Sequence, residues 1–81
     1  MIRFYVQIYE KNQMKPKVQV HVPLPEAPKT ISDIPDFVLE RLKKHGMTEK
    51  QVKEILTKIH KPGSKLRFET PTHDIVVEHL T

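Results

Sequence analysis

Five histidines are the side chains with the clearest capacity for chemistry, because imidazole binds metals and transfers protons near neutral pH. They stand at positions 21, 45, 60, 73 and 79. No two of them have the i, i+4 spacing that places two metal ligands on one helix face. His21, His73 and His79 would meet only if their strands were neighbours in one sheet. The spacing therefore predicts no metal site and no cofactor.

Carboxylates and hydroxyls do not form a catalytic set either. Acid–base catalysis needs two carboxyl groups held across a cleft, and nucleophilic catalysis needs a hydroxyl or thiol beside a base. The acidic residues of the central region fall at expected helix starts or on solvent faces, where they cap and solvate: Asp33, Asp36, Glu40, Glu49 and Glu54. There is no cysteine, and the two glycines form no phosphate-binding loop. We therefore expect the chain not to be an enzyme.

Basic residues outnumber acidic ones, 14 against 10, for a net charge of +4. Those that gather around two expected helices are the candidate nucleic-acid contacts: Arg41, Lys43, Lys44, Lys50, Lys53, Lys58 and Lys61. Two helices joined by a short glycine-containing turn are broadly similar to DNA-reading helix–turn–helix units. Specific readout favours Arg, Gln or Asn, whereas these positions are mostly Lys. A solvated lysine face is the leading interpretation, and phosphate contact is the alternative.

Tyrosines on an expected strand point to a second kind of contact. Residues 2–9 alternate between apolar and polar side chains, and both tyrosines fall on the polar side. Tyrosine is enriched at protein–protein contacts, so we expect the face opposite the core to carry a protein interface. Its candidate residues are Tyr5, Tyr9, Val76 and Leu80. The tyrosines, together with Arg67, also leave open an aromatic platform for RNA bases.

Period-two patterns predict the strands that position these residues. Residues 17–22 and 65–70 alternate like residues 2–9, and a last strand begins at Ile75 and runs towards Leu80. The polar segment 10–16 between the first two strands is a hairpin loop. Three prolines follow in residues 23–31, and because proline removes a ladder donor we expect the sheet to stop there.

Two helices fill the middle of the chain. We expect the first to be capped at Ser32-Asp33, to bury Ile34, Phe37, Val38, Leu39 and Leu42, and to end at Gly46. Thr48 and Gln51 form a capping box for the second helix. An apolar stripe at i, i+3, i+4 and i+7 follows, made by Val52, Ile55, Leu56 and Ile59.

These elements predict one α+β domain over residues 1–81. Its order is ββ–αα–ββ, with an antiparallel four-stranded sheet and two helices packed on one face. A chain of 81 residues has a thin core, and without cysteine it gains no disulfide, so we expect a homodimer formed through a strand edge or the outer sheet face. There is no membrane-length apolar run and no signal-peptide layout, which favours a cytoplasmic bacterial or archaeal protein.

Three short motifs occur in a suggestive order: Val18-Gln-Val-His-Val-Pro-Leu, an Ile34-Pro35 helix start, and Gly46-Met47-Thr48 before the second helix. Most of the chain thereby resembles the SHOCT-like N-terminal module of YvlB-type bacterial proteins. The resemblance implies a regulatory or protein-contact module linked to envelope stress, and it implies no active site. The chain departs from that pattern at Thr72-His73-Asp74, where the family has an Asp-Gly turn.

The leading functional hypothesis is therefore a small, non-enzymatic protein-interaction or regulatory module that self-associates. A nucleic-acid-binding module that uses the lysine-rich helix pair is the alternative. The pattern leaves open the biological process, the partner, the order of strands in the sheet, and whether residues 23–31 are ordered.

Overall fold

The computed structural model describes all 81 residues. In chain order its elements are β1 (Ile2–Glu10), β2 (Val18–Leu24), the 3₁₀ turn η1 (Ile31–Asp33), α1 (Asp36–Lys44), α2 (Glu49–Lys58), β3 (Lys65–Glu69) and β4 (His73–His79). The four strands form one antiparallel sheet in the order β2-β1-β4-β3, so the first and last strands of the chain pair at its centre. The predicted α+β class and ββ–αα–ββ order are confirmed.

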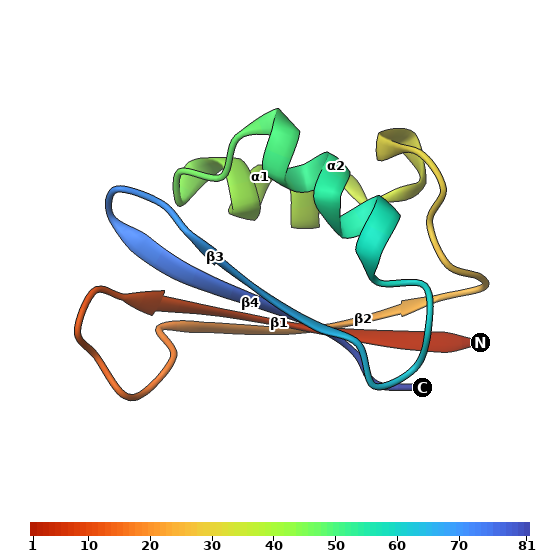
Figure 1. Cartoon of the computed structure of the whole chain (residues 1–81), viewed down its shortest axis with the longest axis horizontal. Coiled ribbons are helices and arrows are strands. Elements are labelled where there is room, and N and C mark those ends of the chain that lie inside the picture. Colours follow the sequence, from red (N-terminus) through yellow and green to blue (C-terminus); the bar gives the residue numbers. More distant parts are fainter.

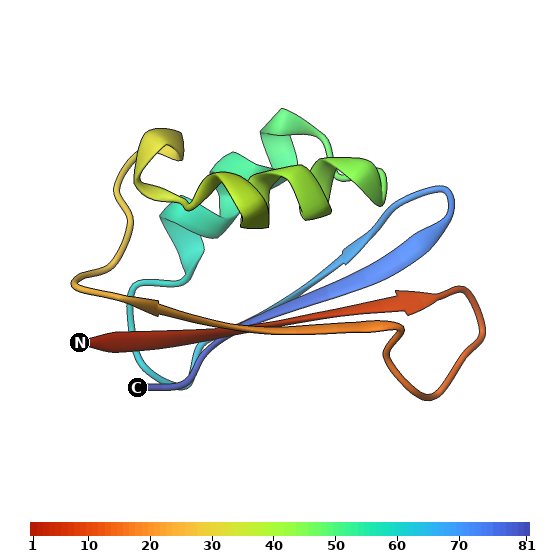
Figure 2. The same ribbon diagram turned by 180° about the vertical axis from the view of Figure 1, so that it is seen from behind.

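Both helices lie on one side of the sheet, and the opposite face is uncovered (Figure 1; Figure 2 from behind). Alternation along each strand sends one set of side chains under the helices, where it joins the helix stripes in a single apolar core. The strands contribute Phe4, Val6, Ile8, Val22, Leu24, Phe68, Ile75 and Val77, and the helices contribute Val38, Leu42, Val52, Ile55 and Leu56. The same alternation presents Tyr5 and Tyr9 on the uncovered face.

The expectation that the sheet stops before Pro23 was wrong, since β2 continues to Leu24. Backbone groups of successive strand residues point to opposite sides. In β1, Arg3 N–H donates to the Thr81 carbonyl and Arg3 C=O accepts from the Leu80 amide, so the backbone groups of Arg3 face β4. The backbone groups of Ile2, and of every second residue after it, therefore face β2. Ile2 pairs with Leu24, which places the Pro23 nitrogen on the free side of β2. The missing N–H therefore costs no ladder hydrogen bond.

The start of α1 also differs from the expectation. The helix begins at Asp36 with Pro35 at its N-cap, and Asp33 closes the preceding η1 turn instead. The Asp33 carboxylate accepts hydrogen bonds from the amides of Lys29 (3.0 Å) and Thr30 (3.1 Å), and these bonds lower the pKa of Asp33. Phe37, expected in the core, is 52% exposed, because it lies one residue away from the Val38–Leu42 stripe.

The signals around α2 are confirmed. Thr48 Oγ1 accepts from the Gln51 amide at 3.2 Å, and Gln51 Oε1 accepts from the Thr48 amide at 3.0 Å, which completes the capping box. Gly46 ends the first helix with a φ of +98°. The last strand is longer than expected and begins at His73, because the turn that precedes it is closed tightly by the Thr70 side chain.

Candidate interaction surfaces

The four residues predicted to form a protein interface all lie on the uncovered face and are half-buried. On the two central strands, Tyr5 stands opposite Glu78, Gln7 opposite Val76, and Tyr9 opposite Asp74. Val76 therefore lies between the rows of the two tyrosines. Leu80 is separate, at the end of the sheet where its amide bonds to Arg3.

Tyr5 is tied to the neighbouring strand β2. Its hydroxyl donates to Gln19 Oε1 at 2.6 Å, and its ring stacks on His21 with centroids 4.4 Å apart. Such cross-strand pairs stabilise the sheet locally. The side chains of Gln19 and His21 are thereby held on the outer face, next to the edge of the sheet.

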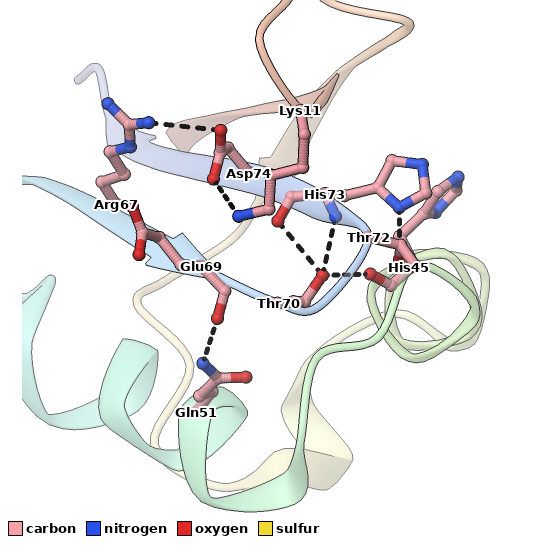
Figure 3. Close-up of polar contacts among 9 residues, drawn as sticks. All are labelled: Lys11, His45, Gln51, Arg67, Glu69, Thr70, Thr72, His73 and Asp74. Carbon is pink, nitrogen blue, oxygen red and sulfur yellow. Dashed lines mark hydrogen bonds and ion pairs between the residues drawn. The ribbon is translucent and has the colours of Figure 1, made fainter.

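Near Tyr9 the outer face carries a shallow hollow of about 190 Å³, lined by Tyr9, Gln13, Arg67, Asp74 and Val76. The Asp74 carboxylate bonds Lys11 Nζ at 2.8 Å and Arg67 at 3.2 Å (Figure 3). The hydrogen bond from Lys11, and the charges of Lys11 and Arg67, lower the pKa of Asp74. The carboxylate is therefore ionised and already paired, as in a structural ion network.

A polar cluster joins the helix pair to the turn between β3 and β4 (Figure 3). Buried Thr70 donates its hydroxyl to the His45 carbonyl at 2.8 Å and accepts from the His73 amide at 3.0 Å. The rings of His45 and His73 meet edge to face, with centroids 4.7 Å apart. Burial and the nearby charges of His45 and Lys17 lower the pKa of His73. This cluster fastens β3 and its turn to the helical layer.

The possible meeting of His21, His73 and His79 does not occur, because His73 and His79 lie at opposite ends of β4 and His21 packs on Tyr5. The His79 ring is buried, with Nδ1 3.3 Å from the Ile59 carbonyl oxygen and Nε2 3.1 Å from that of Thr81. No group of three or more His, Cys, Asp or Glu side chains lies close enough to hold a metal ion.

The candidate nucleic-acid contacts are all exposed on the helical side of the molecule or just after α2. Among these seven residues only Lys58 forms an ion pair, with Glu54 at 3.7 Å. Acidic side chains are interspersed on the same helices, at Asp36, Glu40 and Glu49. The helical side therefore carries basic side chains without ion-pair partners, on a surface where positive and negative charges are interspersed.

The sheet also has two free edges, which the sequence patterns did not distinguish. The β2 edge is formed by Gln19, His21 and Pro23, which point their backbone groups away from β1. The β3 edge is formed by Lys65, Arg67 and Glu69. The absence of charge in residues 18–24 is the signal that could have singled out the β2 edge.

No family model matches the chain, and neither a curated protein nor a solved structure matches it. The resemblance to the SHOCT-like module therefore stays a prediction. No helix of the structure has the length and apolar character that crossing a membrane requires.

Proposed function

We propose that the chain is a small, non-enzymatic protein-interaction or regulatory module, cytoplasmic in location, which self-associates. The observation that carries this proposal is the open side of the sheet: α1 and α2 cover one face, and no element covers the other face or the β2 edge (Figure 1). Half-buried Tyr5, Tyr9 and Val76 provide amphipathic contact area on that side.

The arrangement of the titratable groups supports a non-enzymatic role. Asp74 is held between two cations, Asp33 caps a turn, and both ring nitrogens of His79 face backbone carbonyls. Each of these three side chains makes a contact within the chain that holds the fold together, which supports a structural rather than a catalytic role.

Light scattering over a series of concentrations tests self-association. The expected result is a mass that rises from 9.5 kDa to twice that value as the protein is concentrated. A constant mass of one chain up to about 1 mM, the weak end of measurable association, would contradict the proposal.

A second candidate is nucleic-acid binding through the helix pair, and the specific observation in its favour is that six of the seven candidate cations have no ion-pair partner. Fluorescence anisotropy with labelled single- and double-stranded oligonucleotides tests it. Affinity should fall steeply with salt, and replacing Lys50 and Lys53 by Gln should weaken binding and reduce the salt slope. Absence of binding at about 50 mM salt removes this candidate.

A further inference from the structure

The β2 edge presents backbone hydrogen-bonding groups that this chain does not use. Gln19 and His21 direct their N–H and C=O groups to the free side of β2, and Pro23 directs its C=O there. No strand lies beyond β2, and no loop amide or carbonyl bonds to these residues. A row of unpaired donors and acceptors of this kind is complementary to another extended strand.

The β3 edge is closed to the same contact. The Ser64 carbonyl and the Thr70 amide bond to β4, so by alternation Lys65, Arg67 and Glu69 face the free side. All three side chains are charged and exposed. In addition, Gln51 Nε2 of α2 donates to the Glu69 carbonyl at 3.2 Å, which occupies one of the edge acceptors (Figure 3). Charge, a short strand and a covering side chain are the usual means of protecting an edge.

None of these protections exists on β2. The strand has seven residues against five in β3, and Val18–Leu24 contains no Asp, Glu, Lys or Arg. Its only proline lies next to the end of the strand. On the helix side, Val18 and Val20 are only half-buried, so the strand also carries apolar area that a neighbour would cover.

We propose that β2 pairs antiparallel with β2 of a second copy of this chain, about a two-fold axis at Val20, so that the two sheets become one. In this register Gln19 of each copy stands opposite His21 of the other, and each such pair exchanges both backbone hydrogen bonds. Val20 meets its own counterpart on the helix side. The partner is a second copy because the edge is complementary to itself: it carries no charge that would repel its own image. The proposal rests on the self-association proposed above and names its surface.

A register centred on His21 is the nearest competitor. It would place Gln19 opposite Pro23, which has no N–H to return, and would set two imidazole rings side by side. In the Val20 register the two hydrogen-bonded pairs within β2 are both Gln19 with His21, which have complete backbone groups. Pro23 falls opposite Lys17, which lies just before the strand and whose N–H already donates to the Ile8 carbonyl.

Two matched double variants distinguish these arrangements. Gln19→Lys with His21→Lys sets lysine against lysine in the Val20 register, and should leave a mass of one chain where the unmodified protein is a dimer. Gln19→Lys with His21→Glu sets lysine against glutamate, and should restore the dimer. In the His21 register the second variant would oppose two glutamates and fail to associate. Both variants remove the Tyr5–Gln19 and Tyr5–His21 contacts equally, so thermal unfolding of each serves as the folding control.

Amide hydrogen exchange provides a readout at the backbone itself. The Gln19 and His21 amides should exchange rapidly in dilute protein and become protected as concentration rises. The Lys65, Arg67 and Glu69 amides should exchange at a rate independent of concentration. Protection confined to another surface would overturn the proposal.

The outcomes separate this inference from the proposed function. A dimer that survives in the double lysine variant, but is lost on replacing Val76 by Lys at the centre of the outer face, would overturn the β2 edge and leave self-association standing. A mass of one chain at every concentration would overturn both. A dimer lost in the double lysine variant and regained in the Lys/Glu variant supports the edge and its register.

Discussion

The two edges of the sheet are built in opposite ways. On β3 every residue that faces outward is charged, and helix α2 supplies a side chain to one of its carbonyls. On β2 the outward residues include no Asp, Glu, Lys or Arg, and no other element covers them. Part of the protection of β3 is therefore tertiary: it depends on where α2 begins and on the cluster that fastens the β3–β4 turn beneath the helices. The two edges therefore differ in both charge and coverage, and substitutions on each can test what these differences do.

The largest loss of stability is expected from Gly46→Ala, because Gly46 lies against Thr70, the residue that fastens the β3–β4 turn to the helices. At a φ of +98° an L side chain is strained, and its Cβ would lie 2.9 Å from Thr70 Oγ1. We expect the free energy of unfolding, measured with urea, to fall by about 2 to 3 kcal/mol.

Gly63→Ala is the matched control for this prediction. Gly63 also has a positive φ, of +89°, but a Cβ there would meet nothing within 4 Å. The free energy of unfolding of Gly63→Ala should fall by about 1 kcal/mol, the cost of the backbone conformation alone. Equal losses in the two variants would show that Thr70 does not crowd position 46 and that the cluster contributes little.

Gln51→Ala should destabilise the protein by about 1 kcal/mol, because it removes both the capping-box partner of Thr48 and the donor to the Glu69 carbonyl. Gln51→Glu separates the two roles, since a carboxylate still accepts from the Thr48 amide but donates nothing to β3. Its loss should be the smaller one. If the two variants unfold at the same urea concentration, the capping contact of Gln51 with Thr48 contributes nothing measurable to stability.

Local signals account for much of what the sequence predicted correctly. The capping box of Thr48 and Gln51 and the Gly46 stop each act within a few residues of the chain, and alternation is enough to place Tyr5 and Tyr9 on the outer face. These signals do not depend on which strands become neighbours, so they can be recognised before the topology is known.

Part of what the sequence patterns missed depends on the topology. Pro23 is tolerated because β2 is an edge strand, and the meeting of His45 with His73 depends on the β3–β4 turn lying under the end of α1. The pair Ser32-Asp33 was expected to cap α1, but the Asp33 carboxylate accepts hydrogen bonds from the preceding amides of Lys29 and Thr30. This is a local choice between two turns that the pattern alone does not decide. The hydrogen bond from Gln51 to the Glu69 carbonyl also depends on the topology, since nothing near Gln51 in the sequence indicates that β3 lies beside it.

Mild acid should loosen the protected side of the molecule. The pKa of His73 lies below its ordinary value of 6.5 in the folded state, so the unfolded chain binds the proton first as the pH falls through that value. The free energy of unfolding should therefore decline from about pH 7 towards pH 5. His73→Phe keeps an aromatic ring beside His45 but does not titrate, so urea unfolding of this variant should depend less steeply on pH over that range. An unchanged slope would assign the acid sensitivity to other groups.

The smallest change in stability is expected when the β3 edge is made to resemble the β2 edge. This change is also the most direct test of the comparison between the two edges. Replacing Lys65, Arg67 and Glu69 by threonine keeps strand propensity. It removes exposed charges and the ion pair of the exposed Arg67 with Asp74, which keeps Lys11 as a partner, so stability should change by about 0.5 kcal/mol or less. Assembly should change much more. With both edges uncharged, each copy could pair at β2 and again at β3, and two such contacts build open chains rather than closed dimers.

Light scattering should then show a mass that keeps rising beyond that of two chains as the threonine variant is concentrated. A mass that stops at two chains would mean that charge is not what closes the β3 edge. Adding Gln51→Ala to the threonine variant would then test the second feature that covers the β3 edge. This substitution removes the side chain that donates to the backbone carbonyl of residue 69. Growth only in that quadruple variant would assign the closure of the edge to α2 and not to the charged side chains.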